Sequence, residues 1–277
     1  MSRLSRHRIL IALAPDSLAL VGIRGAFRPR VAERRTTAWD PAFGTEPWQG
    51  AGAALAQLVA KIGSENSEVT VVLSNHFVRY TLVPASAALG NAEEEAAFVR
   101  YCFSKIHGER SKEWDVRLSR QSAGTARIAS AVDSKLIEVI RGAFPAKAKA
   151  KLVSVQPYLM SAFNRWRALL KGARAWLLLV EPQRACLAHF EDERCTTVRN
   201  TRGSFEGPVQ WAELLDRERH QVGAAETPEG VYVHAARGLT GSSAEAQGWT
   251  FSKLALDPVE GLAAAETDPY SMALCAR

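Results

Sequence analysis

RILIALAPDSLALVGIRG, residues 8–25, predicts two apolar strands joined by a tight turn, and this hairpin sets the pattern for the whole chain. A third strand is expected at Arg30–Thr37, then a helix at Gly50–Ile62 and a strand at Val69–Leu73. The first strand is almost continuously apolar, which is typical of a central strand covered on both faces. The N-terminal residues therefore predict a βββαβ unit.

The same order of elements returns in the second half of the chain. WLLLVEPQRACLAHF, residues 176–190, again predicts two strands joined by a tight turn. A strand at Arg194–Asn200, a helix at Pro208–Glu218 and a strand at Gly230–His234 follow. Because the βββαβ pattern is used twice, we expect an α/β protein with two similarly built lobes.

The segment between the two repeats predicts an inserted subdomain at about residues 85–132. Asn91 has the features of a helix N-cap, with Glu94 at the third helical position. Two paired strands are expected after this helix, at Trp114–Leu118 and Thr125–Val132. We therefore expect a first lobe over residues 1–170 that contains the insertion, and a second, reduced lobe over residues 171–277.

Two further elements are expected near the C-terminus. Trp249–Leu256 has the pattern of a final strand, and Pro258–Leu274 is predicted to be mostly helical with an interruption near Pro269.

Composition favours a soluble protein of the cytoplasm. The 277 residues are 47% apolar and 23% charged, and no apolar run approaches the roughly 20 residues needed to cross a bilayer. The apolar stretch after the basic N-terminus is broken by Pro15 and Asp16, so it does not resemble a signal peptide. None of the four cysteines forms a CxxC pair, which fits reduced cytosolic thiols.

The charge of the chain does not indicate a nucleic-acid-binding protein. The net charge is +6 and the isoelectric point about 9.3, which is only mildly basic. The basic clusters lack the interleaved aromatic residues of a single-strand nucleic-acid groove. We expect no nucleic-acid partner and only indirect contact with a membrane.

No metal site is expected. Cys186, His189 and Cys195 have suitable side chains, but Cys186 and His189 are three residues apart on one predicted strand. Their side chains would leave opposite faces of that strand, and a fourth ligand is not evident.

Four segments resemble the actin/hexokinase/Hsp70-like superfold, and within it the scaffold proteins of type IV pilus and type II secretion machines. They are Ile9–Val21, Val69–Pro84 (VTVVLSNHFVRYTLVP), Ser154–Pro157 and Trp176–Glu181. The resembling group comprises PilM, the cytoplasmic domain of GspL and the MshI-like proteins. The resemblance implies two RNase H-like lobes and a cytoplasmic scaffold at the inner membrane. Its implied partners are the N-terminal cytoplasmic tail of a single-pass membrane protein and a secretion ATPase.

The two turns that grip phosphates in nucleotide-binding members of this superfold are altered here. The first turn consists of Ala14, Pro15, Asp16 and Ser17, and Ala12 stands where the resemblance implies an acidic residue. The second turn consists of Glu181, Pro182, Gln183 and Arg184. Neither turn contains a glycine, and proline has no N–H to donate. We therefore expect vestigial phosphate loops, no cofactor and no enzymatic activity.

Asn75 and Arg79 are the candidate partner-binding residues. The resemblance implies that the partner tail docks on the first lobe, which contains the segment Leu73–Pro84. Asn75 can donate and accept hydrogen bonds, and Arg79 can hold a carbonyl or carboxylate group. The alternative interpretation of these two residues is an Asx turn and a surface salt bridge.

Two other functions are weighed against the scaffold. The first is an active ATPase or sugar-kinase-like enzyme of the same superfold, which the missing glycines and the missing acid disfavour. The second is an RNase H-like nucleic-acid-processing protein. This would need a carboxylate cluster across the first and fourth strands, and neither Ala12 nor the apolar strand Val69–Leu73 supplies one.

Overall fold

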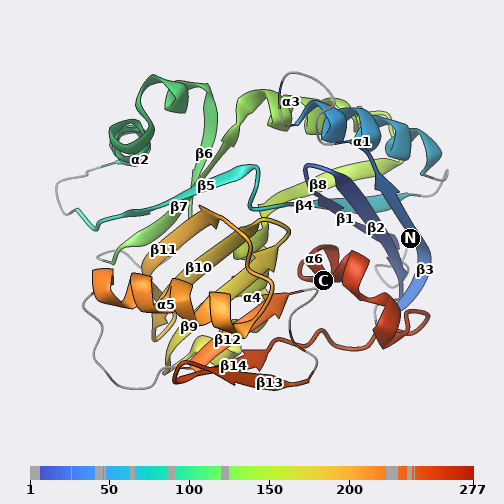
Figure 1. The fold of residues 1–277 in the computed structure, drawn as a ribbon. Helices are drawn as coiled ribbons and strands as arrows, with labels where there is room; N and C mark the ends of the chain where they lie inside the picture. The colour runs from blue at the N-terminus through green and yellow to red at the C-terminus, as the bar shows by residue number, and fades with distance from the viewer. Residues whose placement is uncertain are drawn as a thin grey trace. The chain divides into compact units, whose positions relative to one another are not determined.

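The chain was analysed as a computed structural model that describes residues 7–25, 27–40, 46, 48–62, 66–86, 91–119, 125–222, 230–235, 239 and 241–277. The chain divides into two compact units (Figure 1). Unit 1 comprises Met1–Val78, Val132–Arg165 and Leu256–Arg277, and unit 2 comprises Arg79–Ala131 and Trp166–Ala255. The inserted subdomain thus clusters with the second repeat, and the C-terminal segment clusters with the first.

Unit 1 is built on a five-stranded sheet in the order β3-β2-β1-β4-β8. The strands are β1 (His7–Leu13), β2 (Ser17–Arg24), β3 (Arg30–Ala38), β4 (Ser67–Leu73) and β8 (Ala150–Pro157). β1 pairs antiparallel with β2 and parallel with β4, and β4 pairs parallel with β8. All residues of β1 except the half-buried Arg8 are buried, which confirms the predicted central strand.

Helices α1 (Gln49–Lys61) and α3 (Ser134–Gly142) lie side by side in unit 1 (Figure 1). A Cβ atom built on Gly52 would lie 2.6 Å from Cγ1 of Val139, so the glycine permits the close approach of the two helices. Asp133 caps α3 by accepting a hydrogen bond from the backbone N–H of Lys135.

Helix α4 (Tyr158–Leu170) begins in unit 1 and ends in unit 2. One face of this helix is buried, with Leu159, Phe163, Trp166 and Leu170 each less than 10% exposed. The backbone leaves helical geometry at Trp166 (φ −106°, ψ 16°), the first residue of unit 2 in this helix.

The C-terminal segment differs from the expected helix. It contains two short 3₁₀ turns, Ala264–Glu266 and Asp268–Tyr270, and one four-residue helix, α6 (Ser271–Leu274). Its apolar residues, which include Val259, Tyr270 and Leu274, pack against the β1–β2 face of unit 1. The helical prediction was wrong because apolar contacts spread along an irregular segment gave the same impression as helical spacing.

The main sheet of unit 2 has six strands in the order β11-β10-β9-β12-β14-β13. They are β9 (Arg174–Glu181), β10 (Arg184–Glu191), β11 (Arg194–Arg202), β12 (Gly230–Ala235), β13 (Ser243–Ala246) and β14 (Trp249–Lys253). β9 pairs antiparallel with β10 and parallel with β12, and β12 pairs parallel with β14. Strands β11, β10, β9, β12 and β14 therefore repeat the topology of the unit 1 sheet, and the βββαβ order within both units is the one that the sequence predicts. Helix α5 (Pro208–Val222) covers this sheet through the fully buried Trp211 and Leu215 (Figure 1).

The inserted subdomain is a three-stranded sheet in the order β5-β7-β6 with one long helix. Its elements are β5 (Val78–Val83), α2 (Ala92–His107), the 3₁₀ helix η2 (Gly108–Glu113), β6 (Trp114–Leu118) and β7 (Arg127–Asp133). Asn91 caps α2 as predicted, because its side chain accepts hydrogen bonds from the N–H groups of Glu93 and Glu94. The buried face of α2 carries Val99 and Phe103. Ile106, on the same helix, is 62% exposed.

Candidate functional site

The turn between β1 and β2 uses its backbone groups within unit 1. The N–H of Ala14 donates to the carbonyl oxygen of Ser17 at 2.8 Å, and Pro15 has no N–H. The carbonyl oxygens of Pro15 and Asp16 accept hydrogen bonds from the side chain and the backbone of Trp39, at 2.7 and 2.9 Å. The hydroxyl of Ser17 donates to Asp16 at 2.9 Å. The N–H of Ala14 is thus already hydrogen-bonded within the hairpin, and Asp16 adds an exposed carboxylate to the turn.

The turn between β9 and β10 is a two-residue hairpin in which Glu181 pairs with Arg184. Gln183 has a φ of 54°, and proline fixes the preceding φ near −65°, which together give a type II turn. The carbonyl oxygen of Gln183 accepts a hydrogen bond from the N–H of Gly203 at 3.2 Å. The turn is therefore a tight connection tied to the end of β11.

Arg184, at the start of β10, is the most deeply buried residue of this turn. It is 4% exposed, and one terminal nitrogen of its guanidinium donates to Oδ1 of Asn200 at 3.1 Å. Its Nε has no hydrogen-bond partner among the described residues. Burial is the largest of the effects that lower the pKa of Arg184, and the charges of Arg79 and Arg202 lower it further. The charge of Glu181 raises this pKa.

Asn75 lies in the turn that joins β4 to β5, and its side chain is fully buried. This turn is held by hydrogen bonds from the N–H of Ser74 to the carbonyl of Leu13 and from the N–H of Phe77 to the carbonyl of Ser74, both at 3.0 Å. His76 donates its N–H to the Ser74 hydroxyl at 3.1 Å. Asn75 is thus buried within this turn, and its role in binding a partner stays a prediction.

Arg79 is the second residue of β5 and is half-buried in unit 2. Burial, followed by the charges of Arg202 and Arg110, lowers the pKa of its guanidinium. The charges of Arg202, at the end of β11, and of Arg110 therefore act on Arg79. The charge of Arg79 also acts on Arg184, a residue of the second turn that the sequence analysis treated separately.

The three residues considered as metal ligands from the sequence lie inside unit 2. Cys186, His189 and Cys195 are buried in the main sheet of unit 2, and burial raises the pKa of both thiols. The thiol of Cys195 donates to the carbonyl oxygen of Thr197. Across the part of the chain that the structure describes, no three His, Cys, Asp or Glu side chains gather as metal ligands would.

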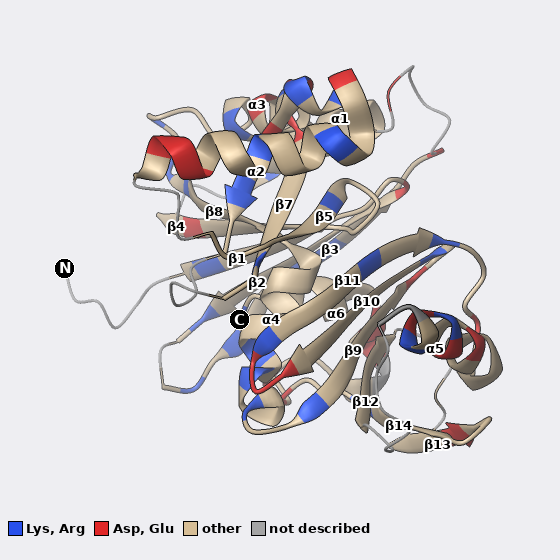
Figure 2. Cartoon of the chain, turned by 90° about the vertical axis from the view of Figure 1, so that its left-hand side faces the viewer, with Lys and Arg blue, Asp and Glu red and all other residues tan. Residues whose placement is uncertain are grey.

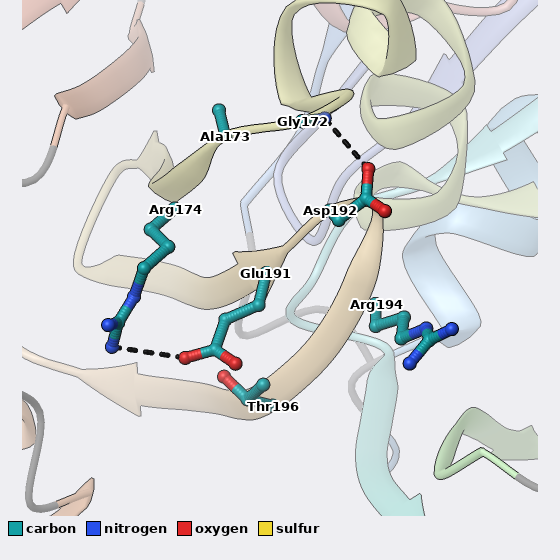
Figure 3. Close-up of a pocket in the computed structure, with 7 residues that line it drawn as sticks. All are labelled: Gly172, Ala173, Arg174, Glu191, Asp192, Arg194 and Thr196. Carbon is teal, nitrogen blue, oxygen red and sulfur yellow. Dashed lines mark hydrogen bonds and ion pairs between the residues drawn. The ribbon is translucent and has the colours of Figure 1, made fainter.

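A shallow surface pocket of about 370 Å³ lies at the opposite end of β9, β10 and β11 (Figure 3). It is lined by Gly172, Ala173, Arg174, Glu191, Asp192, Arg194 and Thr196. Arg174 and Glu191 form an ion pair of 3.1 Å across it, and Asp192 accepts a hydrogen bond from the N–H of Gly172 at 2.8 Å. Arg174, Glu191 and one oxygen of Asp192 are therefore engaged within the pocket.

No helix among the described residues is long and apolar enough to cross a membrane. No family model matches the chain, and no curated protein matches it.

Several solved structures are similar to this chain. The PilM–PilN type IV pilus biogenesis complex matches with a TM-score of 0.58 at 15% identity, over 82% of this chain and 80% of the other. The cytoplasmic domain of EpsL, an inner-membrane component of the type II secretion system of Vibrio cholerae, matches with a TM-score of 0.56 at 10% identity, over 98% and 96% of the two chains.

A third similar structure is a Bacteroides thetaiotaomicron protein described as having an actin-like ATPase fold and unknown function. It matches with a TM-score of 0.57 at 11% identity, over 83% and 82% of the two chains. At these identities the likeness establishes the fold and leaves the function open. Together with the strand order that recurs in both units, it shows that this chain has the actin-like fold.

Proposed function

We propose that this chain is a non-enzymatic scaffold of a type IV pilus or type II secretion assembly complex. It works in the cytoplasm, at the inner face of the membrane, by binding the N-terminal cytoplasmic tail of a single-pass membrane protein. The observation that carries the proposal is the likeness, over most of the chain, to PilM in complex with PilN and to the cytoplasmic domain of EpsL. A secretion ATPase is the second partner we propose, since a scaffold at this position would link it to the membrane protein.

The geometry of the two hairpin turns supports a scaffold without ATPase activity. Nucleotide-binding turns offer free backbone N–H groups to phosphates. Here Pro15 and Pro182 have none, the N–H of Ala14 is engaged within its own hairpin, and Ala12 provides no carboxylate for a metal ion. We therefore propose that Mg²⁺ and ATP are not cofactors of this protein.

The alternative function is an ATPase or kinase with the same fold. Glu181 and Arg184 at the second turn favour this alternative. In a phosphate site with Mg²⁺, the carboxylate could hold the metal ion and the guanidinium could bind a phosphate oxygen. Turnover of ATP that depends on Mg²⁺ and is lost in Glu181→Gln would establish the alternative.

Calorimetry with a synthetic tail peptide tests the scaffold. The coding sequences beside this one are searched for a single-pass membrane protein, and the peptide is its N-terminal cytoplasmic segment. We expect saturable binding to the purified protein. Arg79→Gln should weaken it about tenfold or more, because a charge-assisted hydrogen bond contributes about 1.5–3 kcal/mol.

Arg100→Gln is the matched control, because Arg100 is an exposed arginine on α2 of the same subdomain. It should bind the peptide as the wild-type protein does. Equal affinities for all three proteins would remove Arg79 from the interface. An absence of binding by the wild-type protein would contradict the proposed function itself.

A further inference from the structure

One side of helix α2 carries a charged residue at each end and two aromatic rings between them. These residues, called the outer stripe below, are Glu94, Phe98, Tyr101 and Lys105. They are four, three and four positions apart, so they lie within about 60° of one another around the helix axis. Three of them are exposed, and Phe98 is half-buried. The outer stripe is therefore a surface feature of the inserted subdomain.

Tyr101 forms the exposed centre of the outer stripe. It is 56% exposed, and its ring stacks on that of Phe98, with the ring centroids 6.4 Å apart and the planes inclined by 21°. Phe98 in turn packs against the core of the inserted subdomain, which holds the pair of rings in place. Tyrosine supplies a large contact area at a low cost in conformational entropy, and it is enriched at protein interfaces. A stacked and exposed tyrosine is therefore well suited to be buried by a partner.

The two ends of the outer stripe carry opposite charges. Figure 2 shows acidic residues in the first turn of α2 and basic residues farther along the helix. Glu95 forms an ion pair with Arg127 of β7, and Glu94 accepts a hydrogen bond from the side chain of Asn91 at 2.9 Å. A carboxylate has about four acceptor sites, so Glu94 can bind a further donor while it takes part in the cap. Lys105 lies about 17 Å farther along the helix axis.

The outer stripe is symmetric about a point midway between positions 99 and 100. Glu94 and Lys105 are equally far from this point, and so are Phe98 and Tyr101. An identical helix packed antiparallel about a two-fold axis through this point would place Glu94 opposite Lys105 of the other copy. It would also place Phe98 opposite the second tyrosine. An interface between identical chains about a two-fold axis requires such a self-complementary surface, so the pattern fits a second copy of this chain.

We propose that α2 is a homodimerisation surface in which the outer stripes of two copies of this chain pack antiparallel. The two contacts between Glu94 and Lys105 set the direction, because parallel packing would place like charges opposite each other. The aromatic rings supply the apolar area that is buried. A contact made by one helix from each copy belongs to the small interfaces, below about 1,200 Å², which are typical of transient complexes. The dimer is therefore weak, and its population depends on concentration.

This surface is separate from the residues used in the proposed function. It includes neither Arg79 nor the turn that joins β4 to β5, and its test needs only the purified full chain. Failure of the dimer would therefore leave the proposed scaffold untouched, and failure of the scaffold would leave the dimer untouched.

Analytical ultracentrifugation of the full chain, at concentrations up to about 1 mM, tests the proposal. We expect a reversible equilibrium between monomer and dimer. Lys105→Glu should weaken the association about tenfold or more, because it places two carboxylates opposite each other at both ends of the contact. Arg100→Glu is the matched control, since it makes the same change in net charge at an exposed position of the same helix. Arg100 lies at least about 100° from each residue of the outer stripe, so this variant should dimerise as the wild-type protein does.

Exchanging the charges between two variants tests the antiparallel arrangement. Glu94→Lys alone should also weaken the association, because it places two lysines opposite each other. An equimolar mixture of Glu94→Lys and Lys105→Glu should form a heterodimer, since both ends of the contact then pair opposite charges. Recovery in the mixture would also show that both variants are folded.

Three results would overturn the proposal. The first is a wild-type protein that stays monomeric at about 1 mM, which would leave the outer stripe to a different partner. The second is an association that Lys105→Glu weakens no more than Arg100→Glu does, because the contact would then lie elsewhere on the chain. The third is a mixture that associates no more tightly than either charge variant alone.

Discussion

At the scale of single residues, the position of a charge in its strand pair decides what that charge does. Arg174 and Glu191 are direct partners at one end of β9 and β10, and they form an ion pair of 3.1 Å. Arg184 and Arg202 are direct partners at the other end of the β10–β11 pair and repel each other. The same residue type therefore forms an ion pair at one end of the sheet and a like-charge pair at the other.

His107 gives a prediction about pH. Its ring packs 5.0 Å from that of Trp114 and 6.3 Å from that of Phe103, measured between ring centroids. Burial, followed by the charge of Arg79, lowers the pKa of His107. Between this lowered pKa and the unfolded value of about 6.5, the unfolded chain binds more protons than the native one, so the free energy of unfolding rises with pH.

We therefore expect the protein to lose stability as the pH falls below about 6.5, and His107→Gln to lose less over the same interval. Urea unfolding of both proteins at a series of pH values measures the two slopes. Identical slopes would show that His107 does not contribute to the pH dependence of stability.

The sequence could not predict how deeply the polar residues of the candidate site are buried. Asn75 and Arg79 are polar residues four positions apart, yet Asn75 is fully buried in its turn while Arg79 is half-buried on β5. The partner of Arg184 was also hidden, because the register that brings Arg202 opposite depends on the bulge at His189 and Phe190. Composition and periodicity carry no signal for a shift of one residue.

At the scale of elements, the contact between α1 and α3 depends on one glycine. Glycine normally weakens a helix interior by about 1 kcal/mol relative to alanine. At position 52, however, an added Cβ atom would lie 2.6 Å from Val139. We expect Gly52→Ala to destabilise the protein by about 1–3 kcal/mol, because overpacking outweighs the gain in helix propensity.

Gly142, at the end of α3, is the matched control, since a Cβ atom there would have no neighbour within 4 Å. Gly142→Ala should be neutral or stabilising by up to about 1 kcal/mol. Chemical denaturation measures both changes, and adding Val139→Ala should recover part of the loss caused by Gly52→Ala. If Gly52→Ala proves stabilising, the two helices do not need the close approach.

Helices and strands were predictable where the hydrophobic periodicity agreed with the positions of turn and helix-capping residues. The turns at Pro15 and Pro182 marked the first hairpin of each repeat, and Asn91 marked the start of the helix in the insertion; the structure confirms all three. Strand β13 (Ser243–Ala246) was missed because it is short and lacks large apolar residues. Its pairing with β14 is specified by tertiary contacts and not by its own sequence.

At the scale of the whole molecule, the repeated sheet makes the actin-like fold recognisable despite identities of 10–15% to the similar structures. The topology β3-β2-β1-β4-β8 in unit 1 matches β11-β10-β9-β12-β14 in unit 2. A buried apolar strand with a hairpin on one side and a parallel strand on the other is a pattern that many sequences satisfy. Fold therefore persists while the residues in the two hairpin turns change, and function must be tested at those residues and at the partner surface.

Partner-dependent recruitment to the membrane tests the scaffold most directly. The chain is expressed with the single-pass inner-membrane protein encoded beside it, or with the same protein lacking its N-terminal cytoplasmic tail, and the membrane-bound fraction is measured. We predict that the chain is found in the membrane fraction with the intact partner and in the soluble fraction without the tail. A membrane-bound fraction that is the same with and without the tail would contradict the proposed scaffold.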